Sequence, residues 1–164
     1  MPMEIHRSAL VSHSAAHMYT VIEAAEHYPH FVPWCREVEI LERNDEVVVA
    51  RIAIGYRNLS VHFTTRNRKR FPTWMSIGME QGPFRSFEGE WQLRELDADG
   101  CRIDFRLRYE LDSSAIARLA APAMDRIASR LMHAFLARAD AVSAPAEADA
   151  KVDLETQPTW TPNN

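Results

Sequence analysis

Histidine is the first residue type to consider for chemistry, with seven copies in 164 residues. Two pairs, His13 with His17 and His27 with His30, have the spacing of neighbours on a helix. Zinc needs three or four convergent ligands. The chain has neither an HExxH nor a CxxC motif, and Pro29 argues against a regular helix through the second pair. We therefore expect surface or helix-capping histidines and no metal site.

A covalent mechanism would need a cysteine or serine beside a histidine and an acid. Cys35 follows an apolar Pro-Trp pair, which is typical of a small buried residue. There is no GxSxG motif, and five glycines form no phosphate-binding loop. Glu88 and Glu90 share one strand face near arginines, which favours a solvated face of ion pairs. We expect no catalytic residue, no catalytic cofactor and no enzyme activity.

Large aromatic rings carry more information about function. Most of them fall at positions that face the core of the predicted elements. Phe31, Trp34 and Phe84 instead lie in predicted loops, where packing alone rarely requires a large ring. Two interpretations of these three residues stay open: they belong to the core, or they line the mouth of a pocket.

A basic cluster is the other feature with two interpretations. Arg66, Arg68 and Arg70 share one strand parity, and Lys69 lies beside them. The cluster is either an ordinary charged strand face or a docking patch for RNA phosphates or an acidic partner. The net charge of −4 leaves no global field that would attract a polyanion such as DNA.

The length predicts one domain over residues 1–142, followed by an acidic, Ala- and Pro-rich tail, 143–164, that we expect to be disordered. No apolar run approaches the length of a membrane span, and residues 1–7 contain no secretory h-region. Two cysteines are too few for a disulfide framework. We expect a cytoplasmic protein, with peripheral attachment to the inner membrane as an alternative.

Period-two patterns predict about seven strands. The clearest is 101–111, in which Ile103, Phe105 and Leu107 face one way and arginines face the other. The predicted strands span Met3–Val11, Val38–Arg43, Val47–Gly55, Leu59–Arg70, Trp74–Glu80, Phe87–Leu96 and Cys101–Leu111.

Helical periodicity begins after Ser114 and predicts a long helix over 122–142, with Pro122 in its first turn and a short helical lead-in. Ser14 is a suitable N-cap for a short helix near the N-terminus. The order predicts an α+β domain in which one long helix covers a curved antiparallel sheet. A cavity between helix and sheet is expected from this geometry.

Several blocks resemble one known group of proteins, the START-like, polyketide cyclase-related family that contains coenzyme Q-binding proteins and bacterial ribosome-association toxins. The resemblance covers about residues 3–142 and departs from the family pattern at Ala121-Pro122 and in the acidic tail. The matching blocks are Tyr28–Cys35 (YPHFVPWC), Phe63–Asn67, Gly82–Phe84, Cys101–Phe105, Pro122–Ala128, Met132–Phe135 and Arg138–Ala139.

The resemblance implies a helix-grip fold with an apolar cavity and two functional alternatives. One is non-catalytic binding of ubiquinone in support of respiration, as a chaperone or carrier, with the respiratory membrane surface as a partner. The other is a toxin that binds the large ribosomal subunit and blocks subunit joining. A cyclase-like enzyme acting on a polyketide is a third, less favoured alternative. Because the domain is nearly neutral, its charge favours quinone binding over binding to ribosomal RNA.

A ubiquinone-like polyprenyl quinone would bind between the long helix and the sheet. Its tail would contact Met124, Ile127, Leu131 and Phe135 on the helix side, and Phe63, Ile77, Trp91 and Phe105 on the sheet side. Its head would lie near Phe31, Trp34 and Phe84, with Tyr28, Trp34 and Tyr109 as hydrogen-bond donors.

Overall fold

The sequence pattern produces seven strands, two α-helices and a 3-10 helix, described for residues 2–56, 58–97 and 100–142 in a computed structural model. The sheet order is β1-β7-β6-β5-β4-β3-β2, and all neighbours are antiparallel. The strands are β1 (Met3–Val11), β2 (Cys35–Arg43), β3 (Val47–Tyr56), β4 (Leu59–Arg70), β5 (Trp74–Gln81), β6 (Phe84–Asp97) and β7 (Gly100–Leu111). The helices are α1 (Ala15–Glu23), η1 (Ala25–His30) and α2 (Ala115–Ala141).

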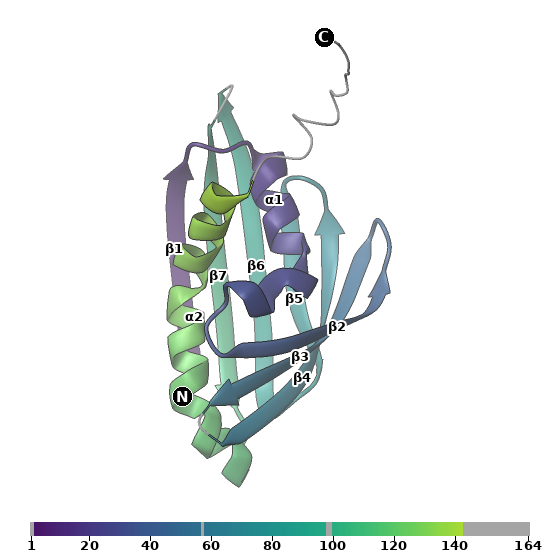
Figure 1. Cartoon of the computed structure of the whole chain (residues 1–164), viewed down its shortest axis with the longest axis vertical. Helices are drawn as coiled ribbons and strands as arrows, with labels where there is room; N and C mark the ends of the chain where they lie inside the picture. Colours follow the sequence, from purple (N-terminus) through teal and green to yellow (C-terminus); the bar gives the residue numbers. More distant parts are fainter. Residues whose placement is uncertain (1, 57, 98–99, 143–164) are drawn as a thin grey trace.

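The sheet is strongly curved and wraps around one face of α2 (Figure 1). Register shifts mark bulges in β2, β5 and β6, and a bulge bends a strand and increases its twist. α1 and η1 lie on the same concave side as α2 (Figure 1). The expected α+β helix-grip architecture is confirmed, whereas the predicted tail, 143–164, lies outside the described residues.

β7 shows why the chain folds in this way. Cys101, Ile103, Phe105, Leu107 and Tyr109 are all buried, while the residues between them are partly or fully exposed. The strict alternation places one face of the strand against α2 and the other in water. The buried residues join one core that also includes α1 and the inward face of α2.

Both α-helices begin at serine N-caps. Ser14 Oγ accepts a hydrogen bond from the His17 backbone N–H, and Ser114 Oγ accepts one from Ala117 N–H. α2 is longer than predicted, because it runs without interruption from Ala115 through Pro122. No separate lead-in helix precedes it.

The first turns of α2 contain apolar residues that are not buried. Ile116 and Leu119 belong to the apolar periodicity of the helix, yet they are 50% and 63% exposed. Figure 1 shows the reason: this end of α2 reaches the lower tip of the molecule, where little of the sheet remains to cover it. The periodic pattern identified the helix but did not show at which residue the sheet stops covering it.

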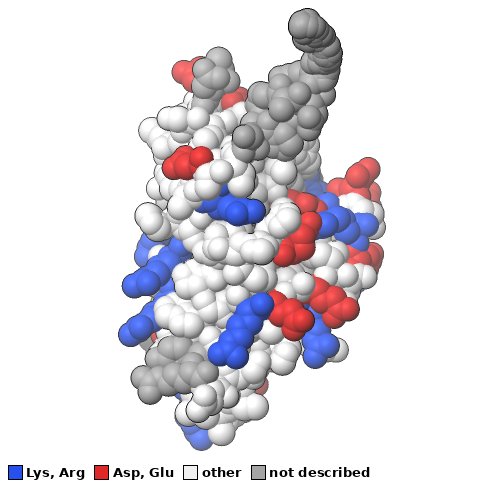
Figure 2. Space-filling view, viewed as in Figure 1, with Lys and Arg blue, Asp and Glu red and all other residues white. Residues whose placement is uncertain are grey.

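Ion pairs fasten α1 and η1 to the neighbouring strands. Arg43 on β2 binds Glu23 at 2.9 Å and Glu26 at 2.6 Å, and Lys69 on β4 binds Glu23 at 3.0 Å. The hydrogen bond from Arg43 holds the pKa of Glu26 below its ordinary value. Figure 2 shows acidic and basic side chains intermingled on this side of the molecule. These contacts fix the short helices over one end of the concave face.

Candidate functional site

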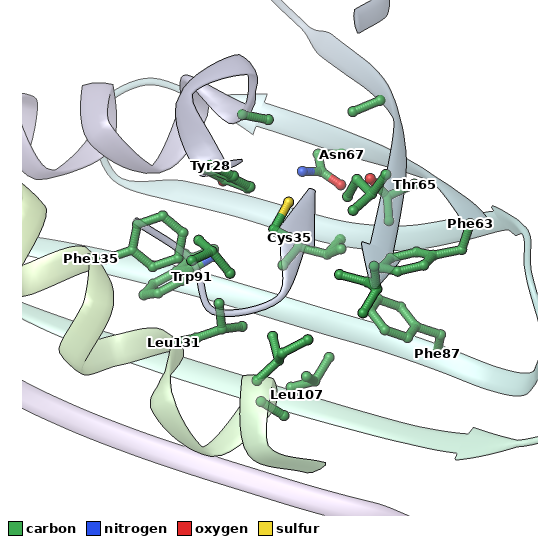
Figure 3. A pocket seen from close by; sticks show the side chains of 18 of the residues that line it. Tyr28, Cys35, Phe63, Thr65, Asn67, Phe87, Trp91, Leu107, Leu131 and Phe135 are labelled. Carbon is green, nitrogen blue, oxygen red and sulfur yellow. The ribbon is translucent and has the colours of Figure 1, made fainter. Parts of the chain in front are cut away.

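A cavity of about 110 Å³ lies in the concave face, between α2, η1 and the strands β3 to β7 (Figure 3). Its walls are almost entirely carbon and sulfur. The lining residues are Ala25, Tyr28, Val32, Cys35, Val48, Ala50, Ile52, Ile54, Phe63, Thr65, Asn67, Met75, Ile77, Phe87, Trp91, Phe105, Leu107, Met124, Ile127, Ala128, Leu131 and Phe135. A pocket with such walls suits an apolar ligand.

Stacked rings build one wall of the cavity. Trp91 stacks on Phe105 with ring centroids 4.3 Å apart, and Phe135 of α2 meets Trp91 edge-on at 5.2 Å. Tyr28 of η1 meets Phe135 edge-on, also at 5.2 Å. These contacts link η1, α2 and the sheet through rigid groups. This wall is therefore a continuous set of ring contacts from η1 through α2 to the sheet.

Flexible side chains complete the lining. Met75, Met124 and Leu131 have several rotamers and can move aside for a larger guest. Ligand pockets usually enclose several hundred Å³, roughly 300–1,000 Å³. The cavity of about 110 Å³ is smaller than that range, so a long ligand would have to displace these side chains or leave part of itself outside.

The reactive groups in the lining are held in unreactive forms. Burial raises the pKa of the Cys35 thiol to about 11, so the thiol stays protonated at neutral pH. The Tyr28 hydroxyl donates a hydrogen bond to the Ile22 carbonyl, and burial raises its pKa well above the ordinary value. Among the residues that the structure describes, no aspartate, glutamate, histidine or lysine lines the cavity.

Nine of the residues predicted to contact a ligand or donate to its head line this cavity. They are Tyr28, Phe63, Ile77, Trp91, Phe105, Met124, Ile127, Leu131 and Phe135. They come from η1, the sheet and α2, and Figure 3 shows several of them converging on the same space. Whether they bind a ligand stays a prediction.

The three predicted mouth residues do not line the cavity. Phe84 is buried against Phe63 and Phe87, where it closes the core. Phe31 packs edge-on against Phe135 on the outer side, with the Arg138 guanidinium 5.3 Å from its ring centroid. Trp34 has a left-handed backbone, with φ of 62°. Phe84 is the first residue of β6, and the rings of Phe31 and Phe84 pack against other aromatic rings at the ends of elements.

Tyr109 is also placed elsewhere. Its hydroxyl donates to a carboxylate oxygen of Asp125 on α2, and burial together with this partner raises its pKa above the ordinary value. The pair ties β7 to the helix. This side chain is thus engaged in the fold and does not line the cavity.

Sequence reasoning missed two polar residues of the wall, Thr65 and Asn67. The signal was present, because both continue the inward parity of Phe63 along β4. Their polar character concealed it. The arginines that alternate with them point outward.

The predicted basic cluster does not form a free patch. Arg66 binds Glu80 at 2.5 Å and Glu42 at 3.4 Å. Lys69 points inward, is only 10% exposed at its side chain, and binds Glu23. Arg70 lies against the ring of Trp74. Only Arg68 has neither an acidic partner nor an aromatic one within the described ranges.

The residues that the structure describes contain no group of three or more His, Cys, Asp or Glu side chains able to hold a metal ion. Within the same ranges, no helix combines the length and apolar character needed to cross a bilayer.

Comparisons with known proteins agree with this architecture. A family model described as polyketide cyclase / dehydrase and lipid transport matches residues 11–136. The ribosome association toxin RatA of Escherichia coli K12 is 31% identical over 139 residues, which is 85% of this chain and 88% of that protein. The mitochondrial coenzyme Q-binding protein COQ10 of Drosophila melanogaster is 24% identical over 143 residues, 85% of this chain and 59% of that protein.

Among solved structures, the Zhui aromatase/cyclase from Streptomyces sp. R1128 superposes with a TM-score of 0.72. It is 16% identical, and the match covers 92% of this chain and 98% of that one. At this identity the likeness shows the fold alone.

Proposed function

The chain belongs to the polyketide cyclase / dehydrase and lipid transport family, and from that premise we propose that it binds an apolar ligand without catalysing a reaction. The observation that supports this most is the cavity between α2 and the sheet, whose lining is apolar apart from two side chains on β4, the Tyr28 hydroxyl, the Cys35 thiol and the Trp91 indole. Within the described part of the chain, the lining contains neither a base nor an activated nucleophile, which favours binding over chemistry.

For the ligand we propose a polyprenyl quinone of the ubiquinone type, carried in support of respiration. Support comes from the relative named as a coenzyme Q-binding protein and from the shape of the site. Each CH₂ group of a polyprenyl tail gains about 0.8 kcal/mol on burial. Because the cavity holds only about 110 Å³, we expect it to enclose the ring or the first isoprene units, with the rest of the tail following flexible side chains of α2.

A titration with ubiquinone-2, which has a short tail, tests this proposal. Trp91 lies in the wall, so a bound quinone should quench its fluorescence to saturation at one molecule per chain. A Trp91→Phe variant controls for quenching of the other tryptophans. Saturable quenching that disappears in this variant supports the proposal, whereas no saturable binding at any concentration below the solubility limit contradicts it.

Ribosome association is the second candidate, because the relative at 31% identity is named as a ribosome association toxin. A specific surface favours it. Arg118, Arg126 and Arg130 are exposed, follow one another at multiples of four residues along α2, and have no acidic partner within the described residues. We call these three residues the α2 arginine row.

Binding to ribosomal RNA through this row would weaken steeply with salt, since each phosphate contact releases counterions. The triple change Arg118→Glu, Arg126→Glu and Arg130→Glu should abolish co-sedimentation with large ribosomal subunits. The matched control is Arg66→Glu, Arg68→Glu and Arg70→Glu on β4. Equal loss in both triples, or no co-sedimentation of the unmodified protein at low salt, would contradict docking through the α2 arginine row.

A further inference from the structure

Asn67 is a polar residue in a cavity wall that is otherwise mostly apolar. It lies on β4 opposite Val48 of β3 and Ile77 of β5, both of which line the same cavity. Its Oδ1 atom is buried and, within the described residues, has no hydrogen-bond partner. Its Nδ2 group faces the sulfur of Met75 at 3.7 Å, which is a weak acceptor. The carboxamide is thus held in an apolar wall with almost none of its hydrogen-bonding capacity used.

Such an arrangement is unfavourable for the empty protein. A buried polar group without a partner destabilises a fold by about 1–3 kcal/mol, and a leucine would fill this position without that penalty. Sites that bind a polar group of a ligand do contain such groups, because the partner arrives with the ligand.

Thr65 adds a second polar group to the same wall. It lies two residues before Asn67 on the inward face of β4 and is buried. Figure 3 shows the two side chains close together, on the side of the cavity away from Leu131 and Leu107 of α2 and β7. The remaining lining is apolar, apart from the hydroxyl of Tyr28, which is engaged with Ile22, the weakly polar thiol of Cys35 and the indole of Trp91.

We infer that the ligand carries a hydroxyl or carbonyl oxygen that binds Asn67 and Thr65, while its hydrocarbon part lies toward α2 and β7. This inference rests on the proposed function and gives the ligand an orientation. A carboxamide both donates and accepts, so it suits a carbonyl or a hydroxyl equally. A quinone ring presents the first in its oxidised form and the second in its reduced form.

The same geometry disfavours a carboxylate head, as in a fatty acid. On the inward face of β4 the nearest cation is Lys69, which is paired with Glu23 and does not line the cavity, while Arg66 and Arg68 lie on the outward face. A carboxylate would be buried without a counter-charge, which is far less favourable than burying a neutral oxygen. The expected ligand class is therefore a neutral amphipathic lipid.

Three probes with the same chain length test the inference: 1-decanol, 1-chlorodecane and decanoate. Dissociation constants are measured by tryptophan fluorescence for the wild type and for Asn67→Leu. The informative quantity is the ratio of the chlorodecane constant to the decanol constant, because differences in water solubility cancel when the ratio is compared between proteins. We expect the ratio to fall about tenfold in Asn67→Leu, and decanoate to bind the wild type weakest.

A matched control and a stability measurement separate binding from structure. Thr64→Val removes a buried hydroxyl from the same strand at a position that does not line the cavity, so it should leave the ratio unchanged. Asn67→Leu should raise the unfolding midpoint of the ligand-free protein, whereas a purely structural asparagine would lower it. Thr65→Val, which should reduce the ratio a few-fold, decides the matter if Asn67→Leu does not fold.

The outcomes distinguish this inference from the proposed function. If the wild type binds decanol and chlorodecane, but the ratio is the same in Asn67→Leu and Thr65→Val, the orientation is wrong and apolar binding stands. If decanoate binds as tightly as decanol, the neutral ligand class is wrong. If none of the probes binds the wild type, both proposals are overturned.

Discussion

Enlarging Ala128 distinguishes a true cavity from a tightly packed core. Ala128 is 2% exposed on the inward face of α2 and lines the cavity. Leucine adds three carbon atoms, worth about 2.4 kcal/mol if all are buried at about 0.8 kcal/mol each. Filling a void of about 110 Å³ gives a similar figure, about 2.6 kcal/mol at roughly 24 cal/mol per Å³. Both values are upper limits, because some rotamers of the new side chain are lost.

We expect Ala128→Leu to stabilise the ligand-free protein by about 1–2 kcal/mol in urea denaturation and to raise Tm by several degrees. Ala123→Leu is the control, because Ala123 is fully buried on the same helix but does not line the cavity. It should destabilise the fold by about 1–3 kcal/mol through overpacking. Ala128→Leu should also reduce ligand binding, since it occupies the ligand's space.

The reasoning is refuted if Ala128→Leu destabilises the protein as much as Ala123→Leu does. Such a result would mean that the space beside Ala128 is already filled by its neighbours. Undiminished binding of ubiquinone-2 by a stable Ala128→Leu variant would show that the ligand lies elsewhere.

Three further changes test individual contacts. Arg43 lowers the pKa of Glu26, so this pair stabilises the fold above the unfolded-state pKa of Glu26, and the contribution is lost as pH falls through the folded-state pKa. Arg43→Ala should therefore reduce the loss of folding stability at acid pH. An unchanged pH dependence of stability would contradict the pairing. Gly82 has φ of 155°, and an added Cβ would lie 2.6 Å from Cβ of Phe63; Gly82→Ala should destabilise the fold by about 1 kcal/mol or more, measured by urea denaturation. With a pKa raised to about 11, the Cys35 thiol should react with iodoacetamide at pH 8 far more slowly in the folded protein than in urea, and equal rates would refute its burial.

Much of the fold followed from periodicity alone. The alternation in β7 predicted both its extent and its buried face, because each residue type there agrees with its surroundings. The long helix was predicted with too late a start, since a proline was taken to mark its first turn. In the structure α2 continues through Pro122, whose side of the helix is exposed.

The site was less predictable for physical reasons. Period two shows that Phe63, Trp91 and Phe105 face inward, but not whether they meet or leave a gap, which depends on the bulges that curve the sheet. Phe31 and Phe84 were predicted to lie in loops at a pocket mouth, yet Phe84 begins β6 and both rings pack against other aromatic rings at the ends of elements. The sequence pattern also does not show which charged residues pair across strands.

The central claim is that the protein carries a neutral apolar ligand between α2 and the sheet. Mass spectrometry of organic extracts from the protein, purified without detergent, tests it most directly. The account predicts a polyprenyl quinone or a similar neutral lipid at a substantial fraction of one molecule per chain, and its loss from Ala128→Leu purified in the same way. A lipid-free wild type, or equal amounts of the same lipid in both proteins, would contradict the account.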